Sequence, residues 1–407
     1  MLEGFLYLAV LILFAKVLEE VSIRLKQSSI VGDVLAGIIL GPAVLNFIHI
    51  NSILEFFIFL GAVFLFFMVG LTELNITMIK KTINTKIVIA SIGIYLLNLI
   101  TFTLFFYLFS LSVSQTLLVA SILSLSSLGV VAKILTEQSI MKTETGIIIF
   151  TIITVLEVSG LFVSSFLIEL AFTQATFDIL HILQSIFEIG VFFFVAGTVG
   201  RYLFPKLFIK LYEHTIAKEV LFGAVISLLF LFVISAEILG IHGTIAALLF
   251  GLMFSPGKFK APCEDVIKKL EGFSEGVFIP IFFAGIGLYF SWSFIYLPIY
   301  EIIIVAVLIL VGRFALAYIV TRLLRIKNPI AISSGILSKG AADLALLLTI
   351  FELNVINEAW FSLITLLSIC TILIVPVLLN KVLEAEKGEI KKVKEELWPY
   401  LSEIPLP

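Results

Sequence analysis

The sequence predicts an all-α membrane protein that crosses the bilayer many times. Of its 407 residues, 61% are hydrophobic and only 14% are charged, and the mean hydropathy is +1.20. Apolar runs of about twenty residues recur along the chain, and this is the length of helix that crosses a hydrocarbon core. Because backbone groups in lipid must be hydrogen-bonded within their own segment, we expect each run to be a helix.

Thirteen apolar segments, separated by charged or turn-forming residues, are the candidate membrane helices. Their approximate ranges are 3–22, 29–48, 53–72, 86–109, 114–135, 144–172, 179–203, 219–236, 241–256, 273–291, 295–322, 329–351 and 357–383. We therefore expect one transmembrane domain at residues 1–383 and a short cytoplasmic tail at 384–407. That tail is too short for a nucleotide-binding regulatory domain.

Lysine and arginine gather in one set of alternate loops. These loops hold Arg24 and Lys26; Lys80, Lys81 and Lys86; Lys142; Arg201, Lys206, Lys210 and Lys218; Lys258, Lys260, Lys268 and Lys269; Arg322, Arg325 and Lys327; and the tail lysines from Lys381. The opposite loops, such as 47–52, 290–293 and 352–358, hold none. Since cytoplasmic loops carry the excess of Lys and Arg, we expect a multi-pass protein of the cell membrane with its N-terminus outside and its C-terminus cytoplasmic.

The sequence gives no support to several other classes of protein. Its net charge is −3, and no basic tract beyond the loops indicates nucleic-acid binding. Cys263 and Cys370 lie far apart and fit no metal spacing. We find no Ser/His/Asp set, HExxH motif or phosphate-binding glycine loop, so we expect neither an enzyme nor a cofactor. The first apolar helix runs into further spans, so we do not interpret it as a signal peptide.

One acid, Glu157, lies near the middle of the apolar stretch 146–172. An ionised carboxylate at bilayer depth is unfavourable, so such residues usually face a cavity and have a function. The alternative is a protonated or paired glutamate with a structural role. Thr154, three residues earlier, lies on the same helical face and could supply a hydroxyl.

Serine and glycine interrupt two apolar segments. The fifth segment contains Ser121-Ile-Leu-Ser-Leu-Ser-Ser-Leu-Gly129, which includes Ser126 and Ser127, and the twelfth contains Ser333-Ser-Gly-Ile-Leu-Ser-Lys-Gly-Ala-Ala-Asp343. A helix that unwinds in the membrane frees carbonyls that can bind a cation, although membrane hydroxyls often bond back to their own helix instead. If helices two to six and nine to thirteen form inverted repeats, the two breaks occupy corresponding positions, which points to a transporter site.

Three stretches together resemble the cation:proton antiporter-2 family, which contains bacterial sodium/proton antiporters and glutathione-gated potassium efflux proteins. They are residues 27–42, 64–73 and 280–288, and the resemblance covers about residues 5–383. In the first stretch, Gly32, Gly37 and Gly41 are spaced for close helix packing. Asp33 is interpreted either as a helix-start acid or as part of an inner vestibule.

The resemblance implies a fold and a mechanism. In the family, the two broken helices cross near the membrane centre, and a six-helix transport bundle slides against a dimerisation panel. It therefore implies inverted repeats, alternating access of an elevator type and a homodimer.

The resemblance also implies roles for charged residues. The family has an Asp-Asp or Asn-Asp pair followed by two residues and glycine, whereas this frame reads Leu156-Glu157-Val-Ser-Gly160. The transport acid is thus retained as Glu157, and its polar neighbour has become Leu156. Arg313 matches a membrane-embedded basic residue of the family and needs an anion, because arginine keeps its proton. We favour a structural pair with Glu188, and Glu157 is the competing partner.

A second pair of charges lies in the twelfth segment. Lys339 corresponds to the family's usual Arg or Lys before glycine, and Asp343 is four residues later, on the same helical face. The two residues either form a local ion pair that stabilises the broken helix or take part in ion passage.

The function expected from these features is secondary active exchange of a monovalent cation for a proton, with Glu157 binding one or the other. With Leu156 in place of the second polar residue, we expect one-for-one, electroneutral exchange. The second helix looks like that of sodium/proton members, and Ser-Ser-Leu-Gly in the fifth is nearer the potassium-efflux members. Since the potassium-efflux members usually carry large regulatory tails, which this sequence lacks, Na⁺ is the expected ion, with Li⁺ and K⁺ as alternatives. Two rival hypotheses are a channel of the same fold and a sensor that transports nothing.

Overall fold

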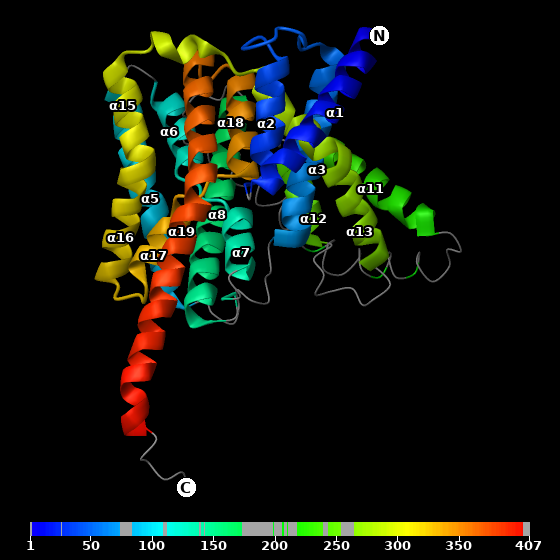
Figure 1. The fold of residues 1–407 in the computed structure, drawn as a ribbon. Coiled ribbons are helices and arrows are strands. Elements are labelled where there is room, and N and C mark those ends of the chain that lie inside the picture. Colours follow the sequence, from blue (N-terminus) through cyan, green and yellow to red (C-terminus); the bar gives the residue numbers. More distant parts are fainter. Residues whose placement is uncertain are drawn as a thin grey trace.

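The computed structural model describes residues 2–25, 27–73, 84–108, 112–137, 140–141, 143–172, 198, 206, 210, 218–238, 243–253 and 264–401. Every regular element in these residues is helical (Figure 1). The helices are α1 (Leu2–Arg24), α2 (Ser29–Leu40), α3 (Ser52–Met68), α5 (Thr85–Leu108), α6 (Val113–Leu123), α7 (Leu128–Glu137), α8 (Glu144–Phe172), α11 (Lys218–Ile238), α12 (Gly243–Met253), α13 (Glu264–Phe273), α14 (Ile279–Leu288), α15 (Ile299–Val307), α16 (Arg313–Leu323), α17 (Pro329–Ile336), α18 (Ala341–Glu352) and α19 (Glu358–Leu401).

Nine stretches of the described chain are helical, long and apolar enough to cross a membrane. Several agree closely with the predicted segments: the span predicted at 86–109 is α5, and the one predicted at 144–172 is α8. Of the span predicted at 179–203, only position 198 is among the described residues. The total of thirteen membrane helices therefore stays a prediction.

The length predicted for the second segment, 29–48, is wrong, because α2 ends at Leu40. The next residue, Gly41, is extended, with φ −78° and ψ −173°. Pro42 follows it, and the proline ring disfavours the helical conformation in the preceding residue. At the other end of the chain, α19 continues past residue 383 and remains helical to Leu401.

The helices form two groups, which lie on opposite sides in Figure 1. The first helix group contains α1, α2, α3, α11, α12, α13 and α14, and the second helix group contains α5, α6, α7, α8, α16, α17, α18 and α19. The extensive helix–helix contacts link members of the same group, whereas α3 with α18 and α2 with α19 touch more sparsely across the boundary. A boundary with sparse contacts is one at which two packed bodies can shift relative to each other.

Glycines hold the first helix group together, as the sequence predicted for the second segment. A Cβ atom added at Gly37 of α2 would collide with the carbonyl of Ala284 of α14, and one at Gly287 would collide with the carbonyl of Val34. A Cβ atom at Gly32 would likewise collide with the backbone of Leu18 in α1. Small residues at these positions let the helix backbones touch, which is how helices associate in lipid.

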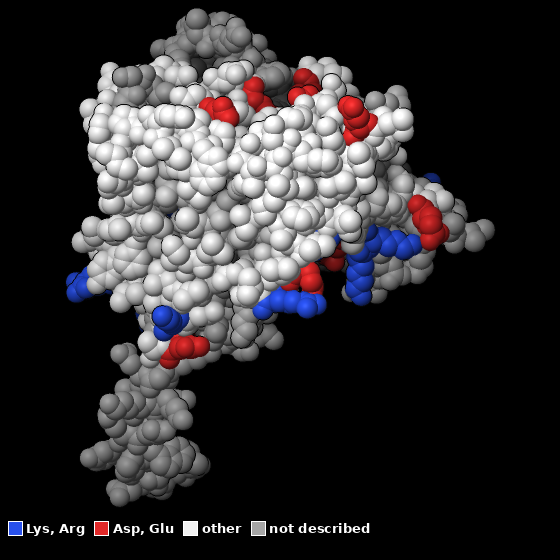
Figure 2. Space-filling model, turned by 45° about the horizontal axis from the view of Figure 1, so that its top comes forward, with Lys and Arg blue, Asp and Glu red and all other residues white. Residues whose placement is uncertain are grey.

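Charge divides the described surface between the two ends of the helices. Figure 2 shows Lys and Arg gathered toward one end of the visible face, where they mix with acids, and acids alone along the other end. This matches the separation of loop charges in the sequence.

Candidate functional site

Two interrupted helices meet in the interior of the second helix group. The chain leaves helical geometry between α6 and α7 and again between α17 and α18. The interruptions bond to each other: the Ser127 N–H donates to the Ser338 carbonyl (3.0 Å), and the Ser338 hydroxyl donates to the Ser127 carbonyl (2.8 Å). These bonds satisfy backbone groups that would otherwise be buried without partners.

A lysine covers the carboxyl end of α6. Lys339 is 1% exposed, and its Nζ donates to the carbonyls of Ile122 (3.1 Å), Leu123 (3.0 Å) and Leu125 (2.9 Å). Its distance to the Asp343 carboxylate is longer, 3.9 Å. The carboxyl end of a helix carries partial negative charge, so the ammonium group neutralises it and also replaces missing intrahelical hydrogen bonds.

An arginine joins the two interruptions. The guanidinium of Arg313 is fully buried, and it donates to the carbonyls of Leu125 and of Ile336 (2.8 Å) and to Ser126 Oγ (2.8 Å). Ser126 in turn donates its hydroxyl to the Ile336 carbonyl (2.6 Å). Arg313 thus bonds to backbone oxygens at the carboxyl ends of both α6 and α17. The expected partner Glu188 lies outside the described residues, so that pair stays a prediction.

Carboxylates face the amino ends of the second halves of both broken helices. The N–H of Leu128, the first residue of α7, donates to Glu157 Oε2 over 3.1 Å. At α18, the Gly340 N–H donates to Asp343 Oδ2 over 3.0 Å. Helix amino ends carry partial positive charge and favour an acid. Each of the four helix ends that the interruptions create therefore faces a buried residue of opposite charge: Lys339 at the end of α6, Arg313 at the end of α17, Glu157 at the start of α7 and Asp343 at the start of α18.

Glu157 itself is 2% exposed on α8, and the structure also describes the other predicted residues of the site. Thr154 is fully buried and donates its hydroxyl to the Phe150 carbonyl (2.7 Å) within its own helix, so only lone pairs are left for a ligand. Leu156 is also fully buried and belongs to the hydrophobic core. Ser127 lies at the interruption and lines a cavity.

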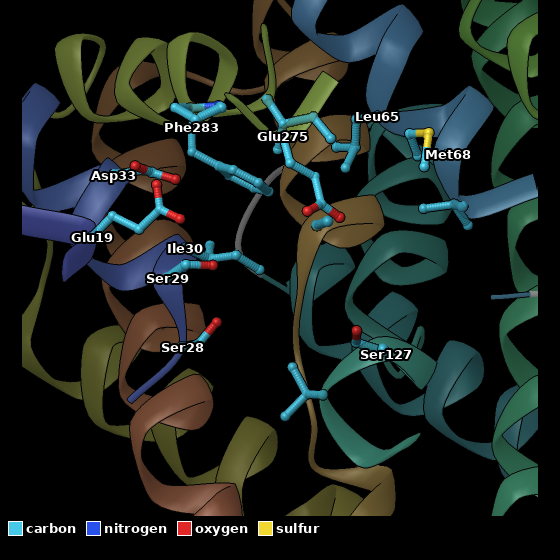
Figure 3. Close-up of a pocket in the computed structure, with 16 residues that line it drawn as sticks. Glu19, Ser28, Ser29, Ile30, Asp33, Leu65, Met68, Ser127, Glu275 and Phe283 are labelled. Carbon is cyan, nitrogen blue, oxygen red and sulfur yellow. The ribbon is translucent and has the colours of Figure 1, made fainter. Parts of the chain in front are cut away.

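That cavity, of about 340 Å³, lies between the two helix groups. Glu19, Asp33 and Glu275 line it from the first group, and Ser127 and Ala341 line it from the second. In Figure 3, Glu19 and Asp33 lie on one side, Ser127 on the other, and Glu275 between them. The cavity thus connects an acidic wall to the interruption between α6 and α7.

Asp33 is the acid whose role the sequence left open. It is the fifth residue of α2, so its interpretation as a first-turn acid is wrong. The carboxyl is 3% exposed, lines the cavity, and its Oδ1 has no hydrogen-bond partner among the described residues. These properties favour the vestibule interpretation.

Sequence reasoning missed the contribution of α1 and of the segment before α14. Lys16 Nζ donates to Glu19 (2.6 Å) and to the Glu275 carbonyl (2.7 Å), which ties α1 to the π-helical turn Ser274–Phe278. A charge on the inward stripe of an apolar helix was the signal that could have located Lys16 and Glu19.

The fold and the site are those of a membrane transporter built on two interrupted helices. The sequence matches the family described as "Sodium/hydrogen exchanger, transmembrane" over residues 9–385. The chain therefore belongs to this family of transporters, and its resemblance to the cation:proton antiporters is confirmed.

Individual proteins agree with this assignment. The chain is 26% identical to the "Probable Na(+)/H(+) antiporter GerT" of Bacillus cereus, over 92% of the chain and 98% of that protein. It is 25% identical to the "Na(+)/H(+)-K(+) antiporter GerN" of the same organism, over 96% and 99%. Its fold is similar to that of the sodium proton antiporter MjNhaP1 from Methanocaldococcus jannaschii, with a TM-score of 0.69, 16% identity and coverage of 93% and 96% of the two chains.

Proposed function

We propose that this protein exchanges a monovalent cation, Na⁺ first, for a proton across the cell membrane, and that Glu157 binds the two alternately. The observation that carries the proposal is the position of Glu157, a buried carboxylate within a membrane span that contacts the interruption between α6 and α7. A carboxylate in a site of low dielectric gains from neutralisation by a proton or by a cation, and the two compete for the same oxygens.

Other oxygens of the site are proposed to complete the cation's coordination. The Leu128 N–H donates to Oε2, and a carboxylate, which has about four acceptor positions, can hold such a donor and a cation together. Lone pairs of the Thr154 and Ser127 hydroxyls are the next oxygens that we propose as ligands. Ser126 has less to offer, because it already donates to Ile336 and accepts from Arg313.

Relatives support Na⁺ and keep K⁺ as the second candidate. GerT and MjNhaP1 are described as sodium/proton antiporters, whereas the description of GerN includes K⁺. In this chain, Leu156 next to Glu157 is apolar, so one acid is available at the family frame. We propose that each turnover therefore moves one cation against one proton and carries no net charge.

We further propose that the second helix group moves as the transport bundle against the first, in a homodimer with thirteen membrane helices per chain. The arrangement of Glu157 and both interruptions within the second group, and the sparse contacts at its boundary, support this motion. The two interrupted helices are proposed to cross near the membrane centre and to belong to inverted repeats. The Lys/Arg-rich end of the helices is proposed to be cytoplasmic.

Proton flux in proteoliposomes with an internal pH dye tests the exchange. Purified wild type and Glu157→Gln are challenged in turn with Na⁺, Li⁺, K⁺ and Rb⁺. Saturable, cation-driven alkalinisation that is lost in the variant supports the proposal and identifies the ion. Uncoupled flux that persists in Glu157→Gln would favour a channel, and no cation-dependent flux in wild type would favour a sensor.

Electroneutrality needs its own measurement. A sodium gradient imposed across a planar membrane that contains the protein should produce no transport current. A current that depends on Glu157 would show that protons and cations are not exchanged one for one, and that part of the proposal would then be wrong.

A further inference from the structure

A second cavity, of about 470 Å³, is lined by the first turns of α5 and α8 and by the turn after α16, and it does not include Glu157. It lies toward the end of the molecule at which α19 extends beyond the other helices (Figure 1). Three basic side chains line it: Lys86 from the first turn of α5, and Arg325 and Lys327 from the turn after α16. One acid, Glu144, also lines it. The cavity therefore has an excess of positive charge.

The acid in this cavity is already neutralised. Lys327 Nζ donates to both oxygens of Glu144, at 2.9 and 2.8 Å. Lys86 and Arg325, in contrast, have no ion pair or side-chain hydrogen bond within the described part of the chain. Two cations consequently face the cavity with no counter-charge from the described residues.

The backbone adds positive potential in the same place. The amino end of α5 opens here, with the Asn84 side chain accepting from the Ile87 N–H (3.0 Å), and α8 begins here at Glu144. Both are long helices, and helix amino ends favour anions. Arg325 also has φ 54°, a left-handed conformation in which glycine is usual at a helix end.

The rest of the lining is apolar and identifies the kind of anion. Ile87, Ile147, Ile148 and Ile326 form the remaining wall. The cavity also lies where three membrane spans end, at Thr85–Leu108, Glu144–Ile168 and Ile299–Leu323. At that depth, a ligand meets headgroups on one side and acyl chains on the other. Basic pockets between membrane helices at this level bind anionic lipid headgroups.

We propose that this cavity binds the phosphate of an anionic phospholipid, with Lys86 and Arg325 as its charged contacts and the isoleucines against the glycerol and upper acyl chain. The planar guanidinium of Arg325 suits a phosphate because two of its N–H groups can bond to two oxygens. The proposal concerns a site separate from Glu157, so it holds whether or not the protein exchanges cations.

Native mass spectrometry of the detergent-purified full chain, titrated with phosphatidylglycerol and separately with phosphatidylcholine, tests the site. Wild type should bind phosphatidylglycerol more tightly, and Lys86→Gln/Arg325→Gln should weaken that binding about tenfold or more, the effect of about 1.4 kcal/mol. The control variant Lys268→Gln/Lys381→Gln removes two exposed charges elsewhere in the described chain and should bind as wild type does. Equal weakening in both variants would mean diffuse surface attraction and would overturn the site.

A third variant separates shape from charge. Ile148→Trp fills the apolar part of the cavity and leaves every charge in place, so it should also release phosphatidylglycerol. Retained binding in Ile148→Trp would overturn the proposed location even if the charge variant folds poorly. Glycerol phosphate is the last probe: equal competition by this soluble phosphate would assign the cavity to a free anion and overturn the lipid. Failure of competition supports the lipid.

Discussion

The N–H of Leu128 donates to the Glu157 carboxylate over 3.1 Å, so the proposed transport acid also caps the amino end of α7. A proton or a cation that arrives at Glu157 reduces the negative charge facing that helix end. Occupancy of the site and stability of α7 are therefore coupled through this bond. Substitution of Glu157 and titration of its carboxyl group test the two sides of this coupling.

The first prediction compares Glu157→Gln with Glu157→Ala. Both variants should lose exchange, since neither can ionise. The glutamine can still accept from the Leu128 N–H, whereas alanine leaves that buried donor without a partner, which destabilises by about 1–2 kcal/mol. Thermal unfolding in detergent should therefore rank wild type and Glu157→Gln above Glu157→Ala. Equal melting of the two variants would contradict the capping role.

The second prediction concerns pH. If one proton and one cation compete for Glu157, lowering the pH must raise the apparent KM for Na⁺, and the slope approaches about tenfold per pH unit where the protonated form dominates. Maximal velocity at saturating Na⁺ should change much less. Initial rates in proteoliposomes across a pH series measure both. A limiting slope near a hundredfold per unit would require two protons and contradict the one-acid cycle.

The sequence located the parts of the site that depend on local signals. An acid within an apolar run marked Glu157, and serine and glycine within two spans marked the interruptions. Both signals can be recognised in a sequence because a charge or an unwound helix is energetically unfavourable in lipid. Such features are therefore rare in membrane spans unless they have a function.

The contacts between distant segments could not be found in that way. Arg313 was expected to need an acid, yet its described bonds go chiefly to carbonyls about 20 and 190 residues away in sequence. One of the two interpretations paired Lys339 with Asp343, four residues on, but the shorter bonds of Lys339 reach carbonyls more than 200 residues earlier. No particular residue type marks a helix end that attracts a distant charged side chain. The pairing of a side chain with the partial charge of a helix end is therefore seen only once the fold is known.

The third prediction separates these two partners of Lys339. Lys339→Met should destabilise the protein by about 3 kcal/mol, because three carbonyls lose their donor and a buried acid loses its nearest cation. Adding Asp343→Asn removes that acid but restores no donor to Ile122, Leu123 and Leu125. Chemical unfolding in detergent should therefore show less than about 1 kcal/mol of recovery in the double variant. Full recovery would mean that the ion pair, and not the helix end, is the main partner.

The fourth prediction concerns access through the cavity between the helix groups. Asp33→Asn keeps the shape of the side chain and removes an ionisable carboxyl group from the acidic wall. It should raise the KM for Na⁺ severalfold, about 1 kcal/mol, with little change in maximal velocity. Glu20→Gln is the matched control. Glu20 follows the cavity residue Glu19 in α1, but it is exposed and pairs with Arg24. Equal changes in both variants would point to overall surface charge, and an unchanged KM in Asp33→Asn would exclude the cavity as the route.

The fifth prediction tests the rigidity of the first helix group, against which the second is proposed to move. Gly37→Ala inserts a methyl group against the backbone carbonyl of Ala284. Because this carbonyl cannot move aside as a flexible side chain could, the variant should lose about 1–3 kcal/mol of stability. Gly223→Ala is the control, since nothing lies within 4 Å of its added Cβ within the described structure. In the middle of α11, this change should be neutral or stabilise by up to about 1 kcal/mol. Thermal unfolding in one detergent compares the two, and opposite signs are expected because only Gly37 lies where two helix backbones touch.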